Sequence, residues 1–318
     1  MRVILYCLLA VWFDFEDGQH IVLAMREKPP VFRFAPSPNG WLHLGHALSA
    51  VLNFRAAQAS GGRFLLRIED IDPDRAKPEH VDGLLDDLSW LGLEWEEPVR
   101  RQSSHFADYR AALAVLQAQG LVYPCFCSRG DVARRLVGIS GDALHDPDGA
   151  PHYPGTCRGL SPDIVAARVA AGEKPSMRLD MAKAIGMPGI QAGPLSWREM
   201  VSPHGDLVQD EPARPEAWGD VILGRSIVPT SYHLSVVLDD AAQGITHVVR
   251  GMDLFHATGL HRLLQVLLGL PAPVYHHHRL ILDEKGRKLS KSQGSLSLKS
   301  LRAAGATQAD ILRMIGLE

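Results

Sequence analysis

Residues 31–46 read Val31-Phe32-Arg33-Phe34-Ala35-Pro36-Ser37-Pro38-Asn39-Gly40-Trp41-Leu42-His43-Leu44-Gly45-His46, and this stretch decides the fold. The apolar run at 31–35 predicts a buried strand, and the segment at 36–40 predicts a turn. From residue 42 to residue 59, apolar side chains recur at spacings of three and four, which predicts a helix. A second strand is predicted at 64–68 and a second helix at 78–95. This alternation of strands and helices predicts an α/β fold with a parallel sheet.

The rest of the chain suggests an interrupted domain. Between about residues 100 and 217 the rhythm changes: a helix near 104–119 leads to paired cysteines and a loop rich in Gly, Asp, His and Pro. The alternation of strands and helices resumes after residue 219. Apolar runs there predict strands at 221–223, 234–238 and 245–250, and a helix is predicted at 255–268. The predicted units are an N-terminal extension at 1–30, the two halves of a nucleotide-binding domain at 31–100 and 218–270, an insertion at 101–217, and a tail at 271–318 with a basic loop and two short helices.

The first 24 residues are expected to lie outside the fold, with translation starting at Met25. Their apolar run, Val3 to Phe13, is too short to span a bilayer. Acidic residues follow it directly and no small-residue cleavage site is present, which argues against a signal peptide. The alternative is an extra strand or helix. We therefore expect a cytoplasmic protein without a membrane contact.

Composition limits the class of protein. The 318 residues are 46% hydrophobic and 22% charged, which is typical of a soluble chain that buries a sizeable core. The 33 basic and 36 acidic residues give a net charge of −3, so any contact with nucleic acid must be local. Four cysteines are too few for a disulfide framework.

The sequence His43-Leu44-Gly45-His46 is a candidate phosphate site at the start of the first helix. Helix N-termini present unsatisfied N–H groups and partial positive charge, which suit phosphate. Histidines three residues apart lie on one face of the first turn, and Gly45 would let a nucleotide approach the backbone. The alternatives are a plain polar helix start or half of a metal site.

A second basic segment lies near the end of the chain, at 279–302, where seven basic residues face two acidic ones. Lysines on a glycine-flanked loop suit charge that develops on a leaving pyrophosphate. The alternative is a solvated basic surface. The sequence lacks the P-loop, dinucleotide, zinc-protease and serine-hydrolase motifs, so no other phosphate cradle competes.

The motifs His43-Leu44-Gly45-His46 and Lys288-Leu289-Ser290-Lys291-Ser292 together resemble the paired signatures of class I aminoacyl-tRNA synthetases. Over about residues 31–295 the chain resembles the catalytic domain of glutamyl-tRNA synthetases. The resemblance implies a Rossmann-like parallel sheet, a zinc-containing α/β insertion and a short C-terminal helical segment that contacts an RNA stem. The segments that carry it further are 33–40, 67–72, 232–240 and 245–251.

This resemblance implies that ATP, accompanied by Mg²⁺, activates glutamate to glutamyl-adenylate without a protein nucleophile. An anionic side chain suits a bidentate arginine better than a lysine. The implied catalytic residues are His43, His46, Lys288 and Lys291. Those implied to hold glutamate are Arg33, Phe34, Ala35, Pro36, Ser37, Glu69, Tyr232 and Arg250. Those implied to hold ATP are His43, Gly45, His46, Asp253 and Lys291.

A metal site is also implied in the insertion. Three thiolates and one oxygen ligand complete a tetrahedral zinc site. The resemblance implies one structural zinc ion, held by Cys125, Cys127, Tyr153 and Cys157. The alternatives are His145 or His152 in place of Tyr153, or free buried thiols. The run 276–278 is expected to be structural or adjacent to the nucleotide rather than to bind metal, because successive side chains of an extended segment point in opposite directions.

Only 26 residues follow Ser292, whereas full-length glutamyl-tRNA synthetases continue into an anticodon-binding region. The short form, the zinc pattern and Val236 resemble the subgroup that attaches glutamate to queuosine at the wobble position of tRNA(Asp). We therefore expect a monomer that activates glutamate without tRNA, with L-glutamate, ATP and the queuosine-containing anticodon stem-loop of tRNA(Asp) as partners. The alternatives are a compact or truncated glutamyl-tRNA synthetase that charges a tRNA 3′ end, and a non-catalytic tRNA-binding relative.

Overall fold

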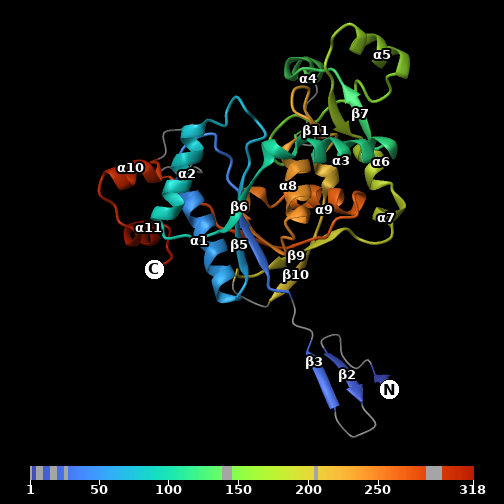
Figure 1. Cartoon of the computed structure of the whole chain (residues 1–318). Helices are drawn as coiled ribbons and strands as arrows, with labels where there is room; N and C mark the ends of the chain where they lie inside the picture. Colours follow the sequence, from blue (N-terminus) through green and yellow to red (C-terminus); the bar gives the residue numbers. More distant parts are fainter. Residues whose placement is uncertain are drawn as a thin grey trace.

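The computed structural model describes residues 2–4, 10–14, 20–24, 28–137, 145–203, 207–283 and 296–318. Within these ranges, no helix combines the length and the apolar character needed to cross a membrane. Figure 1 shows a central sheet between helices, with a smaller sheet and the helices α4 and α5 at one end.

The first half of the central sheet forms as the sequence predicts. Strands β4 (Val31–Phe34), β5 (Arg63–Ile68) and β6 (Glu96–Arg101) are parallel and adjacent in that order. They are connected by α1 (Leu44–Ala59) and α2 (Pro78–Trp90). The apolar face predicted for α1 is buried, as parallel sheets require helices over their faces. Its members are Ala47, Leu48, Val51, Leu52 and Ala56.

The second half of the sheet comes from residues far along the chain. Strand β12 (His247–Gly251) is parallel to β13 (Val274–His278), which is parallel to β9 (Ser196–Met200); β10 (Val208–Pro212) pairs with β9 antiparallel. The two halves meet at β4 and β12. There the Thr246 N–H donates to the Val31 carbonyl at 3.1 Å, and the Val31 N–H donates to Thr246 Oγ1 at 2.8 Å.

Two of the apolar cores contain side chains from the helices that flank the central sheet. One joins α1 and α2 with β4 and β5, and it also buries Leu298 of α10 (Leu298–Ala303) and Ile311 of α11 (Gln308–Met314). A second joins α3 (Phe106–Ala118), α8 (Tyr232–Ala242) and α9 (Ala257–Leu267). The C-terminal helices therefore pack beside α1 and α2, as Figure 1 shows.

A separate antiparallel sheet has the order β11-β8-β7, made of β7 (Val122–Cys125), β8 (Ser176–Leu179) and β11 (Ile222–Gly224). The helices near it are α4 (Arg129–Leu136), α5 (Pro162–Ala170), α6 (Met181–Ile185) and α7 (Pro188–Gln191). Strands from both sides of residue 217 are present in each sheet, since β9 and β10 join the central sheet and β11 joins the smaller one.

Two element predictions were wrong in detail. Residues 234–238, read as a strand, belong to helix α8, which is buried on several sides; an apolar run of that length does not distinguish a buried helix from a strand. Helix α2 ends at Trp90 rather than at residue 95, because Gly92 adopts a left-handed backbone (φ 76°) and Leu93 N–H returns to the Leu88 carbonyl at 3.1 Å.

The N-terminal residues that the structure describes form a small sheet of their own. Strands β1 (Arg2–Ile4), β2 (Ala10–Asp14) and β3 (His20–Ala24) pair antiparallel in the order β1-β2-β3. Figure 1 draws this sheet away from the central sheet and the smaller sheet. The expectation that translation starts at Met25 stays a prediction.

We predict that Gly83→Ala lowers the free energy of unfolding by about 1–3 kcal/mol, despite the better helix propensity of alanine. A Cβ at residue 83 of α2 would overlap the Trp41 ring, which packs on that glycine. The control is Gly130→Ala in α4, where the nearest atom would lie 3.5 Å away. Urea unfolding of both variants checks this. Equal effects at the two glycines would contradict the packing role of Gly83.

Candidate active site

A cavity of about 630 Å³ opens at the carboxyl ends of the central strands. Residues that directly follow β4, β5 and β12 line it, next to the start of α1. The sheet extends in opposite directions from β4 and β12, and this is the place where open α/β sheets bind ligands. Twelve residues predicted for glutamate, ATP or catalysis line the cavity: Arg33, Phe34, Ala35, Pro36, Ser37, His43, Gly45, His46, Glu69, Tyr232, Arg250 and Asp253.

The remaining predicted catalytic residues, Lys288 and Lys291, lie outside the described residues. The chain on both sides of their segment is at the cavity, however. Before it, Arg279, Leu280 and Ile281 line the wall. After it, the Leu298 N–H donates to the Leu42 carbonyl at 2.8 Å, beside the first histidine.

The two histidines of the first motif form the N-terminal cap of α1. His43 Nδ1 accepts from the Gly45 N–H at 3.1 Å, and His46 Nδ1 accepts from the His43 N–H at 3.2 Å. Because each Nδ1 is an acceptor, each neutral ring carries its proton on Nε2. The ring centroids are 3.8 Å apart, so both donors belong to one wall of the cavity. This arrangement suits phosphate oxygens.

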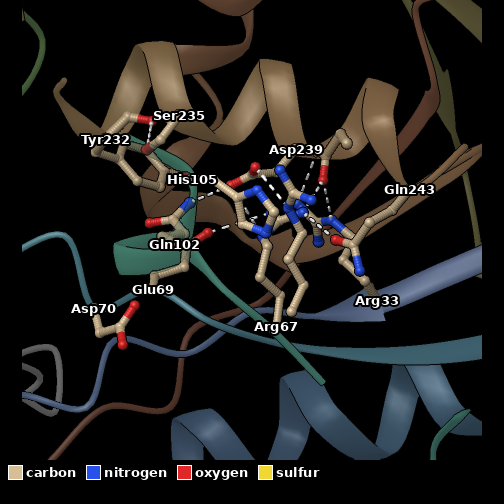
Figure 2. Close-up of polar contacts among 12 residues, drawn as sticks. Arg33, Arg67, Glu69, Asp70, Gln102, His105, Tyr232, Ser235, Asp239 and Gln243 are labelled. Atoms are coloured by element: carbon tan, nitrogen blue, oxygen red, sulfur yellow. Dashed lines mark hydrogen bonds and ion pairs between the residues drawn. The ribbon is translucent and has the colours of Figure 1, made fainter. Parts of the chain in front are cut away.

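A buried ion network lies beneath the cavity. Arg67 is fully buried, and its guanidinium contacts Asp240 at 2.8 Å, Glu69 at 3.3 Å and Asp239 at 3.9 Å. Arg33 also binds Asp240, at 3.1 Å. Figure 2 shows both arginines reaching from the strands toward helix α8, which carries Asp239, and toward Gln243 directly after it. The strands and α8 are therefore joined by paired charges.

Asp239 completes this network on its other side. It accepts from Arg100 Nε at 2.8 Å, Gln102 Nε2 at 2.7 Å and the Tyr109 hydroxyl at 2.9 Å. Three arginines thus face three carboxylates, and a buried charge is tolerated only when it is paired in this way.

The protonation states differ within the network. Burial would raise the pKa of Asp240, but Arg33 and Arg67 hold it below its usual value. Burial does raise the pKa of Glu69, because the nearby arginines compensate its desolvation only in part. A cationic ligand in the cavity would complete that compensation. Burial also raises the pKa of Tyr232 to about 12, so its phenol stays a neutral donor.

The second arginine of the cavity, Arg250, is also held by protein groups. Its guanidinium donates to Thr258 Oγ1 at 2.7 Å, the Leu254 carbonyl at 3.2 Å and His277 Nε2 at 3.1 Å, and lies 3.2 Å from His261 Nδ1. The sequence led us to expect that Arg250 would bind a carboxylate of the ligand with two N–H groups. In the structure, these N–H groups also contact the protein. Both arginines are pre-oriented rather than mobile.

Several of these residues were missed from the sequence. Arg67, Asp239 and Asp240 are in the motifs that carried the family resemblance, but no role was assigned to them. An adjacent acidic pair in an otherwise apolar helix was the available signal, because such carboxylates must find partners when they are buried. Glu199 and His277 gave no comparable signal.

The three cysteines of the insertion come together as predicted. Sulfur atoms of Cys125, Cys127 and Cys157 lie within 4.8 Å of one another and could hold a metal ion. The Tyr153 hydroxyl is 3.3 Å from Cys127 Sγ and accepts from the Cys157 N–H at 2.9 Å. His152 instead contacts the Ala217 carbonyl at 2.9 Å, and His145 is in a bridge with Pro151.

Comparison with known proteins identifies the family. The model of the catalytic domain of class I tRNA synthetases of the E and Q type matches residues 31–318. The chain belongs to this family. As a class I synthetase of this type, it is an enzyme of the ligase class.

The relatives differ in the share of their own length that aligns with this chain. A glutamyl-Q tRNA(Asp) synthetase of Rhodobacter capsulatus is 50% identical over 90% of this chain and 100% of the relative. A glutamate–tRNA ligase 2 of Nitrosococcus oceani is 39% identical over 86% of this chain but 56% of the relative. A solved glutamate-tRNA synthetase of Elizabethkingia anophelis has a TM-score of 0.66 at 24% identity, over 88% of this chain and 54% of that one, which supports the fold.

We predict that Arg67→Met lowers the free energy of unfolding by about 3–5 kcal/mol, because it leaves buried carboxylates without their cation. The matched control is Arg63→Met on the same strand. Its ion pair with Glu96 is nearly half exposed on both sides, so its loss costs about 0–1 kcal/mol. Urea unfolding measures both. If Arg67→Met is as stable as Arg63→Met, the network does not join the strands to α8.

Proposed function

We propose that the chain activates L-glutamate with ATP and transfers the glutamyl group to queuosine at the wobble position of tRNA(Asp). The observation that carries the activation step is the single cavity in which Arg33, Arg250 and Glu69 lie beside the histidine-capped start of α1. It offers cations for carboxylates, an anion for an ammonium group and donors for phosphate.

Glutamate would occupy the inner part of the cavity. Arg33 and Arg250 would face its carboxylates, and Tyr232 would donate a hydrogen bond. Glu69 would accept from the ammonium group, whose charge would favour the ionised form of this carboxyl. A neutral amide in place of the side-chain carboxylate would leave buried positive charge unpaired, so glutamine would be rejected.

ATP would lie over His43, Gly45 and His46, with Asp253 near the ribose and Mg²⁺ accompanying the phosphates. An oxygen of the glutamate α-carboxylate would attack the α-phosphorus. The new P–O bond would form as the bond to the bridging oxygen of pyrophosphate breaks. Positioning and charge stabilisation supply the catalysis, with Lys288 and Lys291 assigned to the leaving pyrophosphate.

Transfer would then use a hydroxyl of the queuosine cyclopentenediol, which attacks the acyl carbon and releases AMP. The choice of this acceptor is supported by relatives named glutamyl-Q tRNA(Asp) synthetase, one of which aligns with this chain over its whole length. We assign the C-terminal residues 271–318 to contact with the anticodon stem. Among the described residues of this segment, Arg279, Lys299, Arg302 and Arg313 are exposed, and such basic side chains suit phosphate contacts that weaken as salt rises.

The decisive experiment is ATP–pyrophosphate exchange with glutamate, run with and without tRNA. We expect exchange without RNA, and loss of roughly 10²-fold or more in His46→Ala, because a phosphate donor is removed. Labelled glutamate should then attach to tRNA(Asp) that contains queuosine and not to the same tRNA without it. Ribonuclease digestion locates the label in the anticodon fragment.

Other outcomes would contradict the proposal. Exchange that requires tRNA(Glu), with label at the 3′ end, would identify a compact glutamyl-tRNA synthetase. Absence of exchange under all conditions would leave only a tRNA-binding role.

We further propose that the cysteine cluster holds one structural zinc ion, with Tyr153 as the fourth ligand. The three thiols fit, since cysteine thiolates in one compact group are typical ligands of structural zinc. The Tyr153 oxygen lies beside them, 3.3 Å from Cys127 Sγ. Burial opposes ionisation of Cys157, but hydrogen bonds from Tyr153 and the Phe126 backbone hold the pKa of this thiol below its usual value. Burial raises the pKa of the Cys127 thiol, and a bound cation would favour its ionised form. Arg178 adds favourable charge, with its Nε 3.3 Å from Cys125 Sγ. When bound, zinc would cross-link β7 to the segment that follows it.

We predict that the purified chain carries about one zinc ion and that Cys157→Ser loses it, with a lower melting temperature. Tyr153→Phe should weaken retention against a chelator, and His152→Ala should not. Metal content is measured by mass spectrometry. A zinc-free wild-type chain in which the thiols of Cys125, Cys127 and Cys157 all react with a thiol reagent would contradict the assignment.

A further inference from the structure

A row of polar residues crosses three adjacent strands of the central sheet and ends at the cavity. In the parallel register, Arg250 of β12 pairs with His277 of β13, and Tyr275 of β13 pairs with Glu199 of β9. Glu199 and His277 are both buried, and Arg250 lines the cavity. A carboxylate two strands away is therefore connected to a residue of the candidate active site.

The connection consists of direct hydrogen bonds. The Glu199 carboxylate accepts from the His277 backbone N–H at 2.7 Å and lies 2.9 Å from His277 Nδ1. On the other side of the ring, His277 Nε2 accepts from Arg250 Nε at 3.1 Å. The Trp197 indole N–H fixes the carboxylate further, at 3.0 Å from its second oxygen.

Only one placement of the ring proton satisfies the hydrogen bonds that run from Glu199 through His277 to Arg250. Burial lowers the pKa of His277 to about 4, so the imidazole is neutral although it faces a carboxylate. With one ring proton, Nδ1–H donates to Glu199 and the Nε2 lone pair accepts from Arg250. The opposite tautomer would place an N–H against the Arg250 N–H and remove the ring donor from the carboxylate, which would keep only the His277 backbone N–H and the Trp197 indole.

The ring of His277 also has little freedom to turn. Tyr275 stacks parallel to it at a centroid distance of 6.0 Å, and Phe255 meets it edge-on at 5.2 Å. Its Nε2 is 3.0 Å from Thr258 Oγ1, which itself accepts from Arg250 at 2.7 Å. Glu199 thus selects the tautomer, and the tautomer supplies the acceptor that orients the guanidinium.

We propose that Glu199 is a positioning residue for amino-acid binding, acting through His277 to hold Arg250 toward the cavity. This inference rests on the proposed function, in which Arg250 faces a carboxylate of glutamate. A rigid guanidinium contributes more to binding, since less side-chain freedom is lost when the ligand arrives. Thr258, Leu254 and His261 also contact Arg250, so loss of Glu199 should weaken orientation without abolishing it.

The test compares Glu199→Ala with Glu199→Gln in glutamate-dependent pyrophosphate exchange. We expect Glu199→Ala to raise the KM for glutamate by about tenfold or more, the effect of one charge-assisted hydrogen bond, and to leave the KM for ATP unchanged. Glu199→Gln keeps one acceptor oxygen for Nδ1–H and should recover part of the loss. Glu211→Ala on neighbouring β10 is the matched control and should behave as wild type.

A spectroscopic measurement separates positioning from general destabilisation. In protein labelled with ¹⁵N-histidine, the His277 ring should show the Nδ1–H tautomer, with its signals assigned by their loss in His277→Asn. In Glu199→Ala the ring should shift toward the common Nε2–H tautomer. A merely structural residue would lower the melting temperature and leave the tautomer unchanged.

The possible failures are distinguishable. If the wild-type protein shows no exchange, the proposed function and the substrate assigned to Arg250 are contradicted. The NMR measurement of the His277 tautomer would still test the hydrogen bonds from Glu199 to Arg250. Normal wild-type exchange, with an unchanged glutamate KM in both Glu199 variants, would contradict the positioning role alone. A parallel rise of the KM for glutamate and for ATP would also contradict it. If Glu199→Ala does not fold, Glu199→Gln carries the comparison.

Discussion

The fully buried guanidinium of Arg67 is the constraint on which the cavity depends. A desolvated cation is stable only among paired anions, and its three carboxylate partners come from the end of β5 and from α8, more than 160 residues later in the chain. Closing the network therefore fixes strands β4, β5 and β6 of the central sheet against α8. Arg33 shares Asp240 with Arg67, so the same closure orients a side chain that lines the cavity.

A similar principle operates around Arg250, with neutral groups in place of most of the anions. Burial and the arginine charge keep His233 and His277 unprotonated, with pKa values near 4. A neutral ring can accept a hydrogen bond at one nitrogen and donate from the other. His277 accepts from Arg250 at Nε2 and donates to Glu199 from Nδ1. The cavity thus has positive charge at two fixed arginines and, at Glu69, a carboxyl group whose ionised form a cationic ligand would favour. This separation is what an amino acid with an anionic side chain requires, and it explains why the geometry favours activation of glutamate.

The sequence predicted the local elements well where one periodicity dominated. The strand at 31–34, helix α1 and the two short C-terminal helices follow from apolar spacing and from turn residues. It failed at 234–238, where a helix buried on several sides loses the polar stripe that identifies helices. It also gave no sign that β9 and β10 would join the central sheet while β11 would not. Strand pairing between distant segments is decided by packing, and no local pattern encodes it.

By itself, the sequence determined the chemistry of the candidate site: two histidines at a helix start, arginines within predicted strands, a glutamate directly after one, and three cysteines with a tyrosine. Those residue types and spacings are local facts, and all twelve described candidates for the two substrates line one cavity. Only the tertiary structure decided how these groups are held. Arg67, Asp239, Asp240, Glu199 and His277 act through partners on other strands and helices. Their roles arise because burial removes water and makes every charge find a partner in space, a requirement that sequence spacing does not reveal.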